Sequence, residues 1–215
     1  MTGDPAPEAP SPDDALVLDP DCRRCPALVE ARDRIAWGNG PTDAAVVVVG
    51  EAPAAGDPDA DEWAGGNRTG LAYTSRHSGQ RIRSLLASVG VDDAFYTNAV
   101  KCFPADGDGS NREPTGAERS NCRAHLRSEL DHIDPSVVLA TGKHATTTLL
   151  AAAGRELDGF LGSVLDPVDA LGTTVVPLLH PSYADVWRSR LGYDREGYRA
   201  ALAAVLRDCG VDAAT

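Results

Sequence analysis

Four of the five cysteines are spaced so that they could bind a metal ion or an iron–sulfur cluster. Cys22 and Cys25 form a C-x2-C pair. Cys102 follows an apolar stretch, and Cys122 lies in the next amphipathic segment. Zinc sites usually contain two close pairs, whereas a cubane cluster on four thiolates tolerates wider spacing. The residues favour a cluster slightly, with structural zinc as the alternative, and Cys209 is predicted to be a buried small apolar residue.

Other polar residues suited to chemistry follow directly after short apolar stretches. They include a carboxylate, an amide and a histidine, which occur within Gly50-Glu51, the segment from Asn98 to Cys102, Gly142, and His180-Pro181-Ser182. In sheets of parallel strands, ligands bind at the carboxyl ends of the strands. If the apolar stretches are such strands, all of these residues lie on one rim of the sheet.

The pattern of apolar residues predicts the elements that position this rim. Four short apolar stretches predict strands over 44–49, 94–100, 136–140 and 173–179. Four amphipathic segments predict helices over 79–89, 115–131, 143–153 and 196–209. Thr115 and Glu118 form a capping box at the start of the second helix. Strands and helices in alternation predict an α/β three-layer sandwich with a central, mostly parallel four-stranded sheet flanked by helices.

Length and composition predict a single folded domain. The chain has 215 residues, 42% of them hydrophobic, which suffices for a core without disulfides. Residues 1–20 are rich in Pro, Ala and Asp and are predicted to be disordered, with the domain over 21–210. No apolar run reaches the roughly 18 residues of a membrane span, and no secretory signal is predicted. A cytoplasmic protein without a membrane partner is expected.

The acidity of the chain bears on its partners. There are 32 acidic and 20 basic residues, for a net charge of −12, and only Lys101 and Lys143 are lysines. Such a balance ordinarily argues against nucleic acid, because phosphate contacts need basic groups. However, proteins of salt-accumulating organisms share this composition, since acidic surfaces stay hydrated. At 1 M salt the Debye length is about 3 Å, so the net charge does not exclude DNA. We therefore expect a halophilic protein.

Several short motifs occur in order along the chain: Cys22-x-x-Cys25, Gly50-Glu51-Ala52-Pro53, Thr97 to Cys102, Cys122, and His180-Pro181-Ser182-Tyr183. This set resembles the iron–sulfur uracil-DNA glycosylases, families four and five of that superfamily. The resemblance runs from about residue 22 to residue 206. It implies a DNA-repair enzyme that hydrolyses the N-glycosidic bond of deoxyuridine in DNA, releasing uracil and leaving an abasic site. It also implies a [4Fe-4S] cluster with a structural role on the four cysteines.

The resemblance further implies roles for residues around the uracil. Asn98 would read O4 and N3 of the base, and Tyr73 would stack on its face beside Gly50. His180 would donate to uracil O2 as negative charge develops there. Glu51 would position or activate water, or stabilise the sugar cation.

For the DNA backbone, Pro181 and Ser182 look like the family's phosphate-gripping turn. Residues 183–190 would form the loop that enters the duplex, with Trp187 or Arg188 as the wedge. The expected partner is therefore uracil-containing DNA, bound by a monomer.

The loop after Glu51 departs from both families. Glu51 matches family four, whereas Asn67-Arg68-Thr69-Gly70 matches family five. Arg76 stands where family five has an aspartate, and Ala54 stands where a glycine is usual. We expect family-four acid chemistry with some family-five-like loop features.

Two alternatives stay open. One is a broader deaminated-base glycosylase that accepts hypoxanthine or xanthine, as family-five proteins can. The other is a low-turnover protein that binds uracil-containing or abasic DNA. Covalent trapping of the product is not expected, because residues 106–114 contain no histidine.

Overall fold

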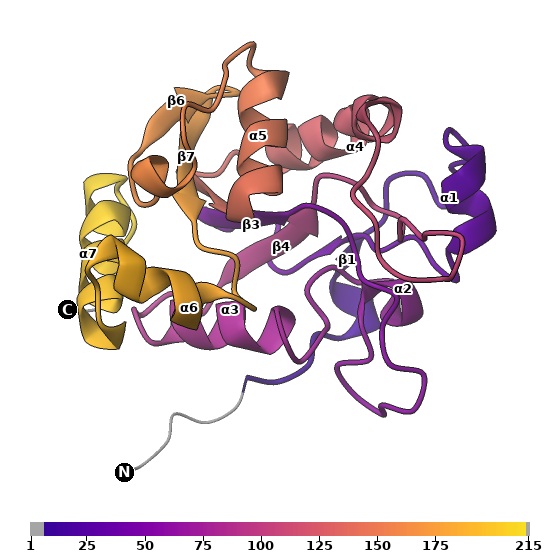
Figure 1. Cartoon of the computed structure of the whole chain (residues 1–215), viewed down its shortest axis with the longest axis horizontal. Helices are drawn as coiled ribbons and strands as arrows, with labels where there is room; N and C mark the ends of the chain where they lie inside the picture. Colours follow the sequence, from indigo (N-terminus) through magenta and orange to yellow (C-terminus); the bar gives the residue numbers. More distant parts are fainter. Residues whose placement is uncertain (1–6, 214–215) are drawn as a thin grey trace.

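The computed structural model describes residues 7–213, which form one mixed β-sheet with helices on both faces (Figure 1). Within these residues, the strands lie in the order β1-β2-β4-β3-β5-β7-β6. Their bounds are β1 Ala15–Leu16, β2 Gly38–Asn39, β3 Val46–Gly50, β4 Ala94–Asn98, β5 Val137–Thr141, β6 Val168–Ala170 and β7 Thr173–Leu178. The α-helices are α1 Pro26–Ala31, α2 Gly66–Thr69, α3 Gly79–Ala87, α4 Gly116–Ile133, α5 Gly142–Ala152, α6 Ala184–Arg188 and α7 Arg195–Asp208. In the part of the chain described, no helix is both long and apolar enough to cross a membrane.

The four strands predicted from the sequence form the parallel centre of the sheet, β4-β3-β5-β7. Three further strands extend its edges and all pair antiparallel: β1 and β2 at one side and β6 at the other. The α/β class and the mostly parallel sheet are confirmed, but the sheet has seven strands rather than the four expected. The additional strands are only two or three residues long, too short for a readable apolar pattern.

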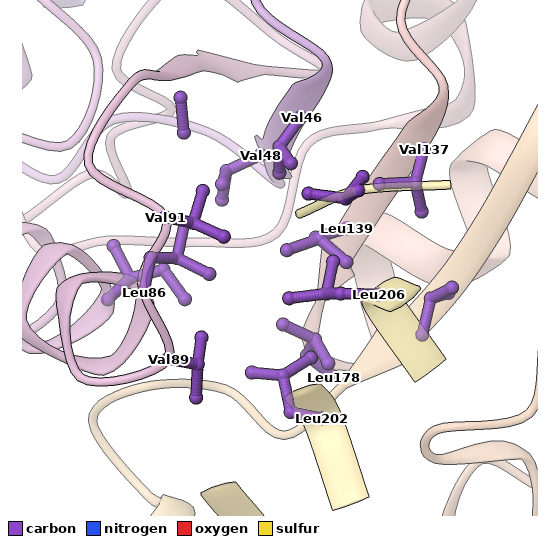
Figure 2. Packing of buried hydrophobic residues seen from close by; sticks show 14 of the residues in the cluster. Val46, Val48, Leu86, Val89, Val91, Val137, Leu139, Leu178, Leu202 and Leu206 are labelled. Atoms are coloured by element: carbon purple, nitrogen blue, oxygen red, sulfur yellow. The ribbon is translucent and has the colours of Figure 1, made fainter. Parts of the chain in front are cut away.

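Strand β3 shows how the sequence builds two cores at once. Successive side chains of a strand point to opposite faces, so the unbroken valine run serves both layers. Val46 and Val48 pack on the side of α3 and α7, where Figure 2 shows them facing Leu86, Leu202 and Leu206. Val47 and Val49 pack on the opposite side, among buried residues of α4 and α5. A sheet covered in this way is held rigidly, and so are the residues at its strand ends.

Helix α4 begins at the predicted capping box. Thr115 Oγ1 accepts the Glu118 backbone N–H at 3.2 Å, and Glu118 accepts the Thr115 backbone N–H at 2.7 Å. Arg112 adds two bonds to the Glu118 carboxylate, at 2.6 and 2.8 Å. This arginine and the backbone bonds lower the pKa of Glu118 to about 2. The loop that precedes α4 and carries Glu113 is thereby fixed to the helix.

The N-terminal segment, predicted to be disordered over residues 1–20, is ordered in part. Ser11 caps a short 3-10 turn over Pro12–Asp14, and β1 then pairs with β2. The folded chain therefore begins before residue 21, because these few residues gain partners in a strand that lies far along the chain. Residues 1–6 lie outside the described residues.

Candidate active site

The carboxyl ends of the parallel strands meet at one cavity of about 540 Å³. The residues predicted for base and sugar all line it, namely Gly50, Glu51, Tyr73, Asn98 and His180, and so does Ser182, which was predicted for the DNA backbone. They come from β3, from the loop before α3, from β4 and from the segment after β7. A second cavity of about 1110 Å³ lies beside it and shares Glu51, His180 and Tyr183. Of the other predicted rim residues, Gly142 lines the second cavity and Cys102 lines neither of the two.

Gly50 is required by the close approach of its neighbours. A Cβ atom at this position would lie 2.5 Å from Asn98 Oδ1 and 2.7 Å from the Tyr73 hydroxyl. Both distances are shorter than any ordinary contact, so a larger residue would displace the amide or the ring. Gly50 thereby allows the amide of Asn98 and the ring of Tyr73 to line the same wall of the cavity.

Tyr73 is held in an unusual backbone conformation, with φ of 54°. For a bulky residue this left-handed conformation is unfavourable and must be enforced by its surroundings. Its hydroxyl hydrogen-bonds to Thr141 at the end of β5, and the side chain is almost fully buried. Burial raises the pKa of Tyr73 above its usual value, so the phenol stays neutral. A fixed, neutral ring at a cavity wall is suited to stacking against a flat base.

Asn98 ends β4 directly opposite Gly50 of β3. Its backbone carbonyl accepts a 2.6 Å hydrogen bond from Lys101 Nζ. Lys101 also donates to Thr97 and to Glu129 of α4, each at 2.6 Å, and Lys101 and Glu129 are completely buried. The Asn98 side chain makes no hydrogen bond to another described residue, so its amide remains available to a ligand in the cavity.

Glu51 lines both cavities and lies close to His144 of α5. His144 Nδ1 is 3.7 Å from Glu51 Oε1, and His144 Nε2 is 3.0 Å from Glu113 Oε1. Glu51 Oε1 is buried and has no hydrogen-bond partner among the described residues. Burial is the main cause that raises the pKa of Glu51; Glu113 raises it further, while His144 and Arg119 act in the opposite direction. The site therefore holds a carboxylate that is only partly solvated.

His180 has a defined tautomer. The backbone N–H of Ser182 donates to His180 Nδ1 at 3.2 Å, which makes Nδ1 an acceptor and places the proton of the neutral ring on Nε2. Burial, with a smaller contribution from His144, lowers the pKa of His180. The ring packs against Gly142, where an added Cβ would lie 3.1 Å from the His180 Cβ. His180 is thus a neutral hydrogen-bond donor.

The residues predicted to contact the DNA backbone lie in different places. Ser182 lines the cavity at the strand ends, whereas Pro181 and Arg188 line a separate groove. Arg188 pairs with Asp185 at 3.1 Å and has 18% of its side chain exposed. Trp187 lines the larger of the two cavities. Trp187 and Arg188 were the two residues predicted to insert into the duplex. Trp187 therefore lies beside the active site, whereas the guanidinium of Arg188 pairs with Asp185 of its own helix.

The four cysteines Cys22, Cys25, Cys102 and Cys122 converge between α1, α4 and the loop after β4. A hydrogen-bonding group lies 3.1–3.4 Å from each sulfur: Arg32 for Cys102, the Lys101 backbone N–H for Cys122, Asn121 for Cys25 and His125 for Cys22. Burial raises the pKa of Cys102 and raises that of Cys122 to about 11. Thiolates at these positions thus need a positive group among them.

The spacing of the four cysteine sulfur atoms bears on whether they could bind one zinc ion or an iron–sulfur cluster. Among the described residues, no three of the four cysteine sulfurs lie within 4.8 Å of one another. A tetrahedral zinc ion with bonds of about 2.3 Å would hold its sulfur ligands about 3.8 Å apart. The described sulfurs are therefore not spaced as the ligands of one zinc ion. Cys209 lies apart from this set and packs against the core formed by α3 and α7, but it is only partly buried rather than buried as predicted.

Comparison with protein families gives one match over most of the fold. The sequence model described as "Uracil DNA glycosylase superfamily" matches residues 37–207. This chain belongs to the uracil DNA glycosylase superfamily. The family resemblance inferred from the motifs is therefore confirmed.

Curated relatives of this glycosylase chain include proteins of both expected families. The Type-5 uracil-DNA glycosylase of Pyrobaculum aerophilum is 33% identical, and the match covers 89% of each chain. The Type-4 uracil-DNA glycosylase of Thermotoga maritima is 30% identical over 75% of this chain and 77% of the relative. That of Archaeoglobus fulgidus, also Type-4, is 29% identical over 88% of each. The mixed motifs of the loop after Glu51 agree with this double similarity.

Some residues of the glycosylase site were not predicted from the sequence. His144, at the start of α5, lies close to both Glu51 and Glu113, and Glu113 comes from the loop before α4. His144 follows Gly142, a strand-end position, so the rim argument could have included it. Nothing in the sequence around Glu113 or Arg32 marks them, because their partners lie far along the chain.

Proposed function

We propose that this protein hydrolyses the N-glycosidic bond of deoxyuridine in DNA, releasing uracil and leaving an abasic site. One observation supports the proposal. The unpartnered amide of Asn98, the neutral hydrogen-bond donor His180 and the partly buried carboxylate of Glu51 line the same cavity. Such a site can bind the edge of a base, stabilise a leaving anion, and either stabilise a sugar cation or orient the water that attacks it.

Recognition requires that the nucleotide leaves the duplex and enters the cavity. The amide of Asn98 can then accept from N3–H and donate to O4 of uracil, a pattern that cytosine does not offer. Tyr73 provides the face on which the base stacks, and Gly50 leaves room for both. Bases with the wrong edge leave the buried amide unpaired, which costs roughly 1–3 kcal/mol.

Bond cleavage separates charge, and the site has a group for each developing charge. His180 donates from Nε2 to uracil O2 as the departing base becomes an anion, without having to lose or gain a proton itself. Glu51 lies close to the sugar side, where its carboxylate can stabilise an oxocarbenium-like sugar or orient the attacking water. His144 lies 3.7 Å from this carboxylate, and Glu113 raises its pKa.

The proposed activity is tested by measuring uracil release from a uracil-containing duplex under single-turnover conditions, in a KCl series. Release of free uracil and formation of an abasic site support the proposal. The same assay with a hypoxanthine-containing duplex tests the broader deaminated-base alternative. Tight binding of uracil-containing DNA without release of uracil would instead indicate the low-turnover binding protein.

Asn98→Asp is expected to lower the preference for uracil over cytosine by about tenfold to a hundredfold, because a carboxylate cannot donate to O4 and repels it. The measurement is the ratio of single-turnover rates on uracil- and cytosine-containing duplexes. Asn111→Asp is the matched control, since Asn111 lines the same cavity and its Oδ1 accepts from the Ala55 N–H. An unchanged ratio in Asn98→Asp would remove Asn98 from base recognition.

We also propose that the four converging cysteines hold a [4Fe-4S] cluster. The open spacing of the sulfurs and the hydrogen-bonding group at each of them support it. When bound, the cluster ties the segment that contains α1 to the loop after β4 and to α4. Its role is structural, since base excision requires no electron transfer.

Protein purified without oxygen is expected to contain roughly four iron atoms per chain and to absorb visible light broadly. Cys25→Ser should lose most of the iron and lower the melting temperature. Cys209→Ser is the control and should keep both, because Cys209 lies in another part of the fold. A colourless preparation with one equivalent of zinc would contradict the cluster.

The composition of the chain bears on the salt concentration at which the protein works. We infer a cytoplasmic, monomeric enzyme of a salt-accumulating organism that acts on uracil-containing DNA. The net charge of −12, with 18 arginines and two lysines, supports this inference.

A further inference from the structure

A groove of about 440 Å³ beside the active site is unusually basic for this acidic protein. It is formed by α3, the turn after β7, α6 and α7, which lie along one side of the molecule (Figure 1). Five arginines line it: Arg76, Arg81, Arg188, Arg195 and Arg199. They are five of the 18 arginines in a chain whose net charge is −12. The concentration of positive charge here is therefore local.

The carboxylates of the groove do not neutralise it. Asp185 is the single acidic residue among those that line it, and it is shared by Arg188 at 3.1 Å and Arg195 at 3.7 Å. Arg199 pairs with Glu196 at 3.4 Å. Among the residues that line the groove, five guanidinium groups thus stand against one carboxylate. Such a surface attracts anions, and guanidinium groups bind phosphate well because they can donate two parallel hydrogen bonds.

The groove adjoins the active-site cavity. Arg76 lines both of them, and in the described part of the chain it makes no hydrogen bond or ion pair. Pro181 lines the groove while Ser182, the next residue, lines the cavity. A DNA strand that leaves the cavity past this turn would therefore meet Arg76 and then the groove.

The turn itself has few donors to spare for a phosphate. Pro181 has no N–H, and the N–H of Ser182 is used by His180 Nδ1. The hydroxyl of Ser182 donates to the carbonyl of His77 at 3.3 Å. Arg81 donates to the carbonyls of Pro181 and Ser182, at 3.4 and 3.2 Å. Phosphate binding at this turn thus depends on guanidinium groups more than on the turn.

We propose that the arginine groove, formed by these five residues, binds the phosphodiester backbone of the DNA strand that carries the target nucleotide. This inference rests on the proposed function for the identity of the ligand. It assigns to α3, α6 and α7 a part in holding DNA, independent of its sequence. Phosphate contacts position the strand and carry no information about the base.

The test measures binding of a uracil-free duplex as a function of KCl concentration, so it does not depend on catalysis. Each phosphate that the protein neutralises contributes about 0.9 to the slope of log K against log salt concentration. Arg76→Gln and Arg195→Gln are each expected to reduce the slope by about one, and the double variant by about two. Arg127→Gln is the matched control, because Arg127 is exposed on α4, on the opposite layer.

Charge-conserving variants separate loss of contact from loss of structure. Arg76→Lys and Arg195→Lys should keep most of the slope, since lysine still neutralises a phosphate. An unchanged salt slope in the Gln variants would overturn the proposal. The proposal would also be overturned if the slope decreased equally in the Gln and Lys variants, or decreased as much in Arg127→Gln. A change in oligomeric mass without a change in slope would assign the groove to protein contacts instead. If no uracil is released but the Gln variants still show the expected decrease in salt slope, only the proposed catalytic function is contradicted.

Discussion

His180→Ala is expected to lower the single-turnover rate of uracil release by about a hundred- to a thousandfold. The neutral ring donates from Nε2 to a charge that exists only as the bond breaks, so the loss falls on the transition state. Affinity for uracil-containing DNA should change little. The low pKa of His180, caused mainly by burial, means that the donor needs no protonation at neutral pH. The rate of the native enzyme should therefore not rise as the pH is lowered through neutrality.

Rate, DNA affinity and melting temperature are measured together for this variant. His132→Ala is the control, because His132 is exposed in the last turn of α4, far from the cavity. A His180→Ala protein that melts earlier but retains its rate when folded would show that His180 is structural. Equal losses of rate and of DNA affinity would indicate that it binds the ground state rather than the transition state.

Glu51→Gln is expected to lower the rate by roughly a hundredfold or more, since the variant keeps the shape and loses the charge. A role limited to capping or packing would cost about 1 kcal/mol of stability and leave the chemistry nearly unchanged. Melting temperature and single-turnover rate of this variant, of His180→Ala and of the double variant distinguish these roles. A native rate in Glu51→Gln would mean that catalysis resembles family five and needs no acid at this position.

The pH profile gives a second readout for Glu51. If the carboxylate is the active form, the rate falls as the pH drops through its pKa. Because burial raises the pKa of Glu51, this acid limb should lie at higher pH than for an ordinary glutamate. Glu113→Gln removes a neighbouring negative charge that raises the pKa further, so it should move the limb to lower pH. Glu51→Gln should abolish the limb, and a limb unchanged in that variant would assign it to another group.

The central sheet and the residues at its carboxyl edge could be predicted from local sequence patterns. Long β-branched runs such as that ending at Gly50 have one stable placement, buried between two layers of helices. Parallel strands end at the same edge, so Asn98 and His180 had to meet Glu51. The capping box of Thr115 and Glu118 was also predictable, because it involves only neighbours along the chain.

Tertiary structure alone decided the features that depend on distant partners. The edge strands are too short to carry a pattern and form only because β4 and β7 offer unpaired edges. His144 bridges Glu51 and Glu113 because the start of α5 lies beside the loop before α4. The arginine groove draws its residues from 76–81 and 188–199, and an arginine in an isolated sequence carries no sign of its distant neighbours. Local pattern fixes which elements form, whereas the clustering of charge depends on how those elements pack.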